Sequence, residues 1–298
     1  MKKQKNNIHG VILLDKPTGR SSNAVLQRIK WLLNAKKAGH TGSLDPLATG
    51  LLPICLGQAT KVSEYLLHSH KKYTTVLKLG EVTDTLDSEG EVTITKAVKV
   101  SDEQLQAALE SFRGEIKQVP PMYSALKKDG QPLYKLARKG EVIDRPARDM
   151  TVYNLEARRI DEMHAELQVH CSSGFYIRSL VHDLGQVLGC GAHVVELRRT
   201  DIKALKVEQA HSMSDIEGRE LADLLLPIDA LIEHMPKIEI SDAQATSMLQ
   251  GKVTSAQGLT TREVTRFYRT NGTLFGVGEV NDNGTIKAQK TFVLDDSN

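Results

Sequence analysis

Hydrophobic positions recur along the chain with two different periods, which predicts strands and helices intermixed. Residues 8–14 are largely apolar and are typical of a buried strand. Residues 73–79 and 165–171 alternate from one face to the other, as strands with one buried face do. Apolar side chains spaced by three and four positions predict helices over 22–33 and 176–188.

Local signals mark several further elements. Ser101 and Gln104 fit a capping box at the start of a helix that stops at Gly114. Residues 119–149 predict a long insertion that carries one short helix, and residues 193–202 predict another strand. Because strands and helices do not alternate strictly, the predicted fold class is α+β, with a mixed, largely antiparallel sheet flanked by helices.

Two domains are predicted, one over residues 1–235 and a smaller one over 236–298. The smaller one begins with a predicted helix at about 241–250. Asn271-Gly272 and Asn283-Gly284 then separate short alternating runs, and such pairs are the strongest short hairpin signal. These features predict a small C-terminal β-barrel.

Charge is distributed unevenly along the 298 residues, although the formal net charge is only +2. Residues 16–40 contain six basic side chains and no acidic one, and residues 121–160 contain nine basic and five acidic ones. Acidic residues gather instead at 81–91 and 215–223. Basic faces on a nearly neutral protein favour a polyanion bound locally, whereas a single cluster also fits a solvated helix face.

The cysteine pattern indicates neither a metal site nor a disulfide framework. Cys55, Cys171 and Cys190 form no C-x-x-C pair, and we expect no metal. The apolar run Val11–Leu14 is too short for a signal peptide, and no stretch has the length of a membrane span. We therefore expect a cytoplasmic, reducing location without membrane contact.

The stretch Gly39–Gly50 breaks every period with three glycines and a proline, and it is predicted to be a loop. Leu44 and Leu47 within it are apolar, which indicates a packed loop. Asp45 precedes a proline, so its backbone is held extended and its carboxylate has a defined direction. The alternative is an Asx-turn, in which Asp45 bonds only to its own backbone.

This loop resembles the catalytic loop of the TruB-type tRNA pseudouridine synthases, which isomerise uridine 55 in the T-loop of tRNA. Further stretches resemble the same family in the same order, roughly over residues 10–200. They are Leu14–Gly19, Ser21–Asn23, Leu56–Lys61, Pro121–Leu126, Ser173–Arg178, Gly189–His193 and Leu197–Arg199. An ordered set of motifs is far more specific than any one of them.

The resemblance implies the pseudouridine synthase fold and a C-terminal domain similar to the PUA RNA-binding domain. It implies tRNA, bound through its T-stem-loop, as the partner. We expect a monomer, with no obligate protein partner. The isomerisation breaks the N1–C1′ bond and rejoins the uracil through C5, with no redox change and no added atom. We therefore expect no cofactor.

The resemblance also implies the roles of two charged residues. Asp45 matches the catalytic aspartate of the family, and an ionised carboxylate can act as a nucleophile. Attack at C6, attack at C1′ and removal of the C2′ proton all remain open. Arg178 matches the active-site arginine and would lower the pKa of Asp45. The alternative for Arg178 is a helix residue at the surface.

Four further residues are expected to contact the substrate by the same resemblance. Tyr73 matches a tyrosine that stacks on the uracil and could also accept the C5 proton, and Tyr176 and Leu197 would line the site. His40 would fill the space left by the extruded uridine. The alternatives are a core tyrosine at 73, a capping or buried histidine at 40, and ordinary packing for Tyr176 and Leu197.

The insertion over residues 119–149 matches the segment with which the family grips RNA. Its basic side chains are expected to contact the RNA backbone, where phosphate contacts dominate affinity. The residues expected to do so are Lys127, Lys128, Arg138 and Lys139.

Other functions remain as alternatives. A non-catalytic RNA-binding or tRNA-folding protein would use the same basic faces, but it would need no carboxylate near an anionic ligand. A pseudouridine synthase could also act on another RNA. A metal-dependent hydrolase using His182, Asp183 and His193 lacks a familiar ligand spacing.

Overall fold

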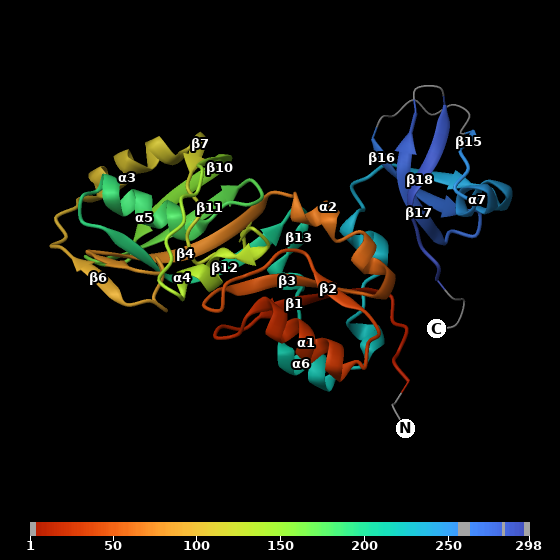
Figure 1. The fold of residues 1–298 in the computed structure, drawn as a ribbon, viewed down its shortest axis with the longest axis horizontal. Helices are drawn as coiled ribbons and strands as arrows, with labels where there is room; N and C mark the ends of the chain where they lie inside the picture. The colour runs from red at the N-terminus through yellow and green to blue at the C-terminus, as the bar shows by residue number, and fades with distance from the viewer. Residues whose placement is uncertain (1–3, 256–262, 282–283, 295–298) are drawn as a thin grey trace.

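The computed structural model describes residues 4–255, 263–281 and 284–294, and a nine-stranded sheet runs through its larger part (Figure 1). Seven strands lie in the order β1-β3-β12-β4-β11-β10-β7, while β2 pairs with β3 and β13 with β12. Their bounds are β1 Gly10–Lys16, β2 Ala38–His40, β3 Thr49–Leu56, β4 Lys71–Leu79, β7 Gly114–Gln118, β10 Arg148–Arg159, β11 His164–Cys171, β12 Ala192–Ile202 and β13 Leu205–Lys206.

One parallel pairing joins the two halves of this otherwise antiparallel sheet. Strands β3 and β12 run parallel, with Thr49 opposite Arg198 and Gly50 opposite Arg199. Gly50 has a φ of +100°, and a Cβ there would lie 2.2 Å from the Arg199 carbonyl oxygen. Only glycine fits this approach. The predicted mixed, largely antiparallel sheet is confirmed.

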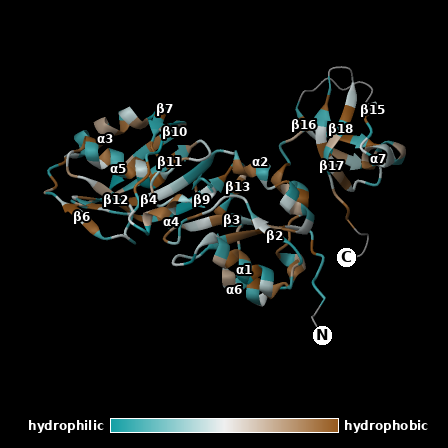
Figure 2. Ribbon diagram, in the orientation of Figure 1, coloured by the Kyte–Doolittle hydropathy of each residue, from teal (hydrophilic) through white to brown (hydrophobic). Residues whose placement is uncertain are grey.

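Amphipathic helices cover the sheet, and Figure 2 shows apolar and polar residues side by side on them. Helices α1 (Ser22–Leu32) and α6 (Met213–Gly218) lie together beside β1 and β3, whereas α3 (Asp102–Leu109) and α5 (Ile177–Val187) lie over the other half (Figure 1). Ser21 caps α1, and the capping box predicted at Ser101 and Gln104 is present at α3. The main core packs α1, α3 and α5 against the sheet.

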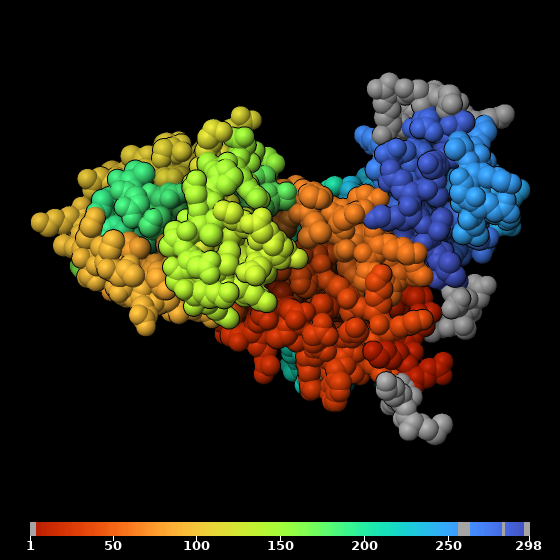
Figure 3. Space-filling model, in the orientation of Figure 1, coloured from red at the N-terminus to blue at the C-terminus, as the bar shows by residue number. Residues whose placement is uncertain are grey.

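Shorter elements connect these layers. They are the 3₁₀ turns Gly57–Lys61, Glu110–Phe112, Val207–Gln209, Leu221–Asp223 and Ile228–Leu231, the helices α2 Glu64–Leu67 and α4 Leu133–Ala137, and the strands β5 Glu81–Thr83, β6 Val92–Thr95, β8 Lys127–Lys128 and β9 Gln131–Pro132. The predicted insertion carries β8, β9 and the expected short helix α4. In Figure 3 its yellow-green atoms form a lobe beside the red N-terminal residues.

A second, five-stranded sheet forms the C-terminal part, in the order β14-β16-β17-β18-β15. Its elements are β14 Lys237–Ile240, α7 Asp242–Leu249, β15 Thr254–Ser255, β16 Val264–Arg269, β17 Leu274–Val280 and β18 Thr285–Thr291. The hairpin predicted at Asn271-Gly272 joins β16 to β17, whereas Asn283 lies outside the described residues. Leu274 and Phe292 share a core with Val62 of the larger part, so the two parts pack directly together.

Several predicted boundaries are wrong by a few residues. The first strand covers Gly10–Lys16 rather than 8–14. The predicted loop Gly39–Gly50 is shorter at both ends, because β2 reaches His40 and β3 begins at Thr49. Backbone pairing of β3 with β1, β2 and β12 extends the strand through residues that local composition assigns to a loop.

Candidate active site

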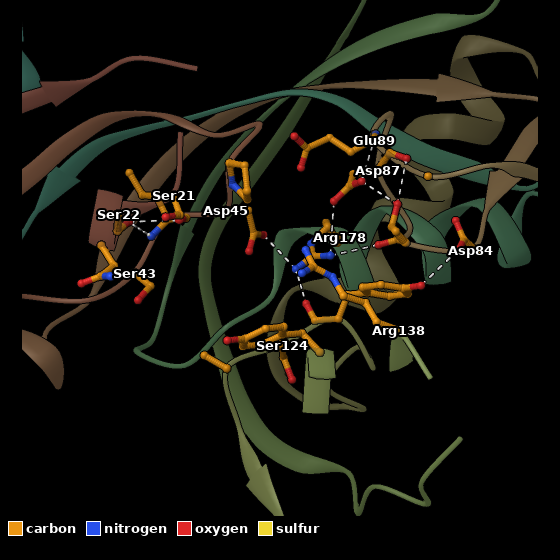
Figure 4. Close-up of a pocket in the computed structure, with 18 of the residues that line it drawn as sticks. Ser21, Ser22, Ser43, Asp45, Asp84, Asp87, Glu89, Ser124, Arg138 and Arg178 are labelled. Atoms are coloured by element: carbon orange, nitrogen blue, oxygen red, sulfur yellow. Dashed lines mark hydrogen bonds and ion pairs between the residues drawn. The ribbon is translucent and has the colours of Figure 1, made fainter. Parts of the chain in front are cut away.

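A cavity of about 930 Å³ opens between the N-terminal turn of α1 and Arg178 of α5 (Figure 4). The N-terminal turn of α1, the loop around Asp45, residues 84–91, part of the insertion and Arg178 of α5 line it. The volume is in the range of small-molecule and cofactor pockets, and it is large enough to receive a nucleoside. Five stretches that are separate in the sequence therefore form one site.

Arg178 connects the two sides of this cavity. Its guanidinium lies 2.9 Å from the Asp45 carboxylate and 3.2 Å from that of Asp87. It also donates hydrogen bonds to the carbonyl oxygens of Thr85, at 3.0 Å, and Tyr123, at 2.7 Å. The Arg178 side chain is only 5% exposed, while that of Asp45 is 39% exposed. The buried cation is therefore paired, and the carboxylate remains accessible from the cavity.

The expected ion pair is present, but the predicted lowering of the Asp45 pKa is wrong. Although the carboxyl group faces the cavity, surrounding protein removes much of its hydration, and this raises the pKa of Asp45. The Arg178 guanidinium lowers that pKa, while the Asp87 carboxylate raises it further. Desolvation together with a second carboxylate outweighs the attraction of one shared arginine.

Asp87 is a site residue that the sequence analysis missed. It is buried, and its Oδ1 accepts hydrogen bonds from the Thr85 hydroxyl at 2.6 Å and the Glu89 amide at 3.1 Å. Its sequence neighbours formed only an acidic stretch, which is also typical of a solvated surface. The one sequence feature that could indicate a buried carboxylate is the apolar Leu86 beside Asp87. The contact between Asp87 and Arg178 joins residues far apart in the sequence, so local sequence could not predict it.

Tyr73 and Leu197 lie on neighbouring strands, Tyr73 in β4 and Leu197 in β12. Burial raises the pKa of the Tyr73 hydroxyl to about 12, although the adjacent Arg199 guanidinium has the opposite effect. Arg199 is itself buried and donates to the carbonyl oxygens of Leu51, at 2.8 Å, and Gly42, at 3.2 Å. Among the described residues, neither Tyr73 nor Leu197 lines the cavity.

Tyr176 and His40 are likewise not among the described residues that line the cavity. Tyr176 precedes α5, where Gln118 donates to its carbonyl oxygen at 3.0 Å and accepts from its amide at 2.8 Å. Burial raises the pKa of Tyr176, and the Asp45 charge contributes to this rise. Burial and the Arg199 charge lower the pKa of His40, which favours a neutral imidazole.

The four basic residues predicted on the insertion are all exposed. Lys127 and Lys128 form β8. Arg138 lines the cavity, and its guanidinium lies 5.7 Å from the centre of the Tyr134 ring. Lys139 follows it at the surface. Of these four, Arg138 lines the cavity, and the other three are exposed residues outside its lining.

The residues of the alternative metal site do not converge. Within the described ranges, no group of three or more His, Cys, Asp or Glu side chains is arranged to hold a metal ion. His193 is buried, with its Nδ1 3.2 Å from the Glu81 carbonyl oxygen, while burial raises the pKa of Asp183. None of the helices in the described residues is long and apolar enough to cross a membrane.

Comparisons with family models cover most of the chain. Residues 30–177 match the N-terminal domain model of the TruB family of pseudouridylate synthases. Residues 178–233 match a C-terminal domain of tRNA pseudouridylate synthase B, and residues 236–291 match the TruB C-terminal model of pseudouridine synthase II.

Relatives and solved structures extend the match to nearly the whole chain. Proteins named tRNA pseudouridine synthase B from Stutzerimonas stutzeri and Ectopseudomonas mendocina are each 50% identical over 97% of both chains. A chain of a Cbf5-Nop10-Gar1 complex, 28% identical, covers 96% of this chain and 85% of its own with a TM-score of 0.72. A chain of an H/ACA RNP bound to a substrate RNA gives the same TM-score at 26% identity, covering 97% of this chain and 86% of its own. The chain therefore belongs to the TruB family of pseudouridylate synthases.

Proposed function

We propose that the cavity converts uridine 55 in the T-loop of tRNA to pseudouridine, with Asp45 as the reacting carboxylate. The observation that carries the proposal is an accessible Asp45 carboxylate 2.9 Å from the buried Arg178 guanidinium, at a cavity of about 930 Å³. A site that only bound RNA would gain nothing from a carboxylate facing a polyanion. The names of the relatives, which specify tRNA, support the substrate.

The reaction asks for few chemical groups. The N1–C1′ bond breaks, the uracil rotates, C5 bonds to C1′, and the C5 proton leaves while N1 gains one. Atoms and electrons balance without an oxidant, a metal or a second substrate. Asp45 supplies the nucleophile or base, and Arg178 holds it in place and offsets its charge. Attack at C6, attack at C1′ and C2′ deprotonation are all compatible with this role.

The neighbouring residues have proposed roles around the extruded base. Tyr73 stacks on the uracil, while Leu197 supplies an apolar wall and Tyr176 a further substrate contact. Because burial raises the pKa of the Tyr73 hydroxyl to about 12, this hydroxyl is protonated at neutral pH, which disfavours its acceptance of the C5 proton. The Asp45 charge acts on the hydroxyls of both Tyr73 and Tyr176, and this closeness to the carboxylate supports their roles. A neutral His40, on the strand that leads into the Asp45 loop, suits insertion into the stacked T-loop.

The insertion and the C-terminal domain are proposed to hold the rest of the tRNA. Exposed Lys127, Lys128 and Lys139 suit phosphate contacts, and Arg138 reaches the cavity itself. We propose a catalytic domain over 1–235 and a PUA-like domain over 236–298. A monomer needing no other protein remains a prediction, as does a cytoplasmic location, which fits the bacterial tRNA-modifying relatives.

Substitution of the carboxylate by its amide tests the proposal. Asp45→Asn keeps the shape of the side chain and removes its charge, so we expect at least about a 10³-fold loss of single-turnover rate, since it removes the nucleophile itself. Binding of tRNA, measured by filter retention, should change little. Pseudouridine at position 55 should also be missing from tRNA of cells that carry only this variant.

The same experiment separates the alternatives. Undiminished isomerisation by Asp45→Asn would remove Asp45 from the mechanism. Loss of isomerisation with every cellular effect retained would favour the RNA-folding role instead. Pseudouridine lost at another RNA position, with position 55 intact, would point to a different substrate.

A further inference from the structure

The segment that joins β1 to α1 contacts the main chain of the loop that carries Asp45. Thr18 donates from its hydroxyl to the Leu47 carbonyl oxygen at 3.0 Å. The amide of Gly19 donates to the Pro46 carbonyl oxygen at 2.8 Å. The buried Lys16 ammonium donates to the carbonyl oxygens of Pro46, at 3.2 Å, and Ala48, at 2.6 Å. The residues after Asp45 are thereby held from one side.

Ser22 holds the residue before Asp45. Its hydroxyl accepts a hydrogen bond from the Leu44 amide at 2.7 Å and donates one to the Leu44 carbonyl oxygen at 3.0 Å (Figure 4). Ser22 is only 2% exposed, so water does not compete readily for either bond. One hydroxyl therefore occupies both main-chain groups of the residue next to the reacting carboxylate.

The contact is separate from helix capping. The adjacent Ser21 is the N-cap of α1, and its hydroxyl accepts from the Ala24 amide at 3.2 Å. Ser22 is the first residue of the helix, where its own hydroxyl has no capping role to fill. The two neighbouring serines therefore have different contacts. Ser21 caps α1, whereas Ser22 bonds to Leu44, 22 residues later in the chain.

We propose that Ser22 is a positioning residue for the reaction, with Thr18 as a second one on the far side of Asp45. Ser22 fixes the main chain at Leu44, and Thr18 fixes it at Leu47, so that the Asp45 carboxylate stays at Arg178 and faces the cavity. The inference rests on the proposed function, in which Asp45 is the reacting group. The further inference is that the chemical step is fast only while the main chain on both sides of Asp45 is held in place.

Two variants test it by separating rate from affinity. Ser22→Ala removes both bonds to Leu44, and we expect its single-turnover rate on tRNA to fall about 10- to 100-fold, because a displacement near 1 Å has an effect of that size. Thr18→Val is isosteric and lies at an exposed position, so it removes one bond without disturbing packing. We expect a several-fold fall there. In both variants the Kd for tRNA should stay within about twofold.

Ser101→Ala is the matched control. It removes a hydroxyl that caps α3, away from the cavity, and so lowers stability without touching the Asp45 loop. Its rate should equal that of the wild type when all proteins are assayed well below their melting temperatures. A rate loss in Ser101→Ala equal to that in Ser22→Ala would assign the effect to stability alone and overturn the proposal.

The remaining outcomes are equally decisive. Wild-type rates in both Ser22→Ala and Thr18→Val would overturn the positioning role, as would rate and affinity falling by the same factor. If Asp45→Asn is inactive while Ser22→Ala is fully active, only the positioning inference fails. If Asp45→Asn remains active, the proposed function fails instead.

Discussion

At the scale of single residues, the site is a competition between burial and charge around one arginine. Arg178 faces two carboxylates, Asp45 at 2.9 Å and Asp87 at 3.2 Å. A single guanidinium shared in this way offsets desolvation only partly, so the pKa of Asp45 is raised. Each partner therefore has a definite and opposite effect on the same carboxyl group.

Removing the two partners of Asp45 should shift its pKa in opposite directions. Asp87→Asn removes a like charge, so the pKa of Asp45 should fall, while Arg178→Ala removes the neutralising charge, so it should rise. Carboxyl ¹³C NMR titration measures both shifts directly. Shifts of the same sign in the two variants would contradict this account of the site.

The raised pKa also makes a prediction for stability. Asp45 has an ordinary value of 3.8 when unfolded, and the folded protein holds its proton more tightly. The ionised group therefore destabilises the fold, fully so above its folded pKa and not at all below about 3.8. Asp45→Asn should melt at a higher temperature than the wild type at pH 7, with a gap that closes as the pH falls towards 4. A melting temperature of Asp45→Asn below that of the wild type at pH 7 would show that the ionised carboxylate stabilises the fold, contrary to this prediction.

At the scale of elements, the loop that carries Asp45 is positioned where the two halves of the sheet meet. Strand β3 follows the loop directly and pairs in parallel with β12 through Gly50 and Arg199. Arg199 then donates to the carbonyl oxygens of Leu51 and Gly42, one on each side of Asp45 in the sequence. The geometry of Asp45 thus depends on a strand pairing far away in sequence.

Gly50→Ala should show how tightly this junction is packed. A Cβ at Gly50 would lie 2.2 Å from the Arg199 carbonyl oxygen, so we expect the free energy of unfolding to fall by about 3 kcal/mol or more. Gly189→Ala is the control, since Gly189 also has a positive φ of +78° but nothing within 4 Å of its Cβ position. It should lose only about 1 kcal/mol. Equal losses of unfolding free energy in the two variants, measured by urea unfolding, would mean that the positive φ and not the close approach to Arg199 causes the destabilisation.

At the scale of the whole molecule, the two sheets share a hydrophobic core. Leu274, Val277 and Phe292 from the C-terminal part pack with Val62 and Leu66 from the larger part. Polar contacts reinforce this interface, since the Tyr268 hydroxyl donates to Asp229 at 2.6 Å and Lys61 donates to the Thr291 carbonyl oxygen at 2.7 Å. The C-terminal part is therefore docked on the rest of the protein.

The shared core predicts that both parts unfold together. Calorimetry should show one transition, because separating the two parts exposes buried side chains on both. Phe292→Ala removes a large side chain from the interface and should lower the stability of the whole by about 3 kcal/mol or more. Two well-separated transitions in the wild type would show that the interface does not couple them.

The sequence by itself determined the fold class, most strands and helices, and the Asp45–Arg178 pair. Periodicity and caps are local properties of the chain, and the ordered motifs identified the family and with it both residues. Tertiary structure alone decided the role of Asp87, the parallel pairing at Gly50 and the direction of the Asp45 pKa. Each of these depends on how much water is excluded and on which distant charges meet, and such quantities are defined only once the chain has folded.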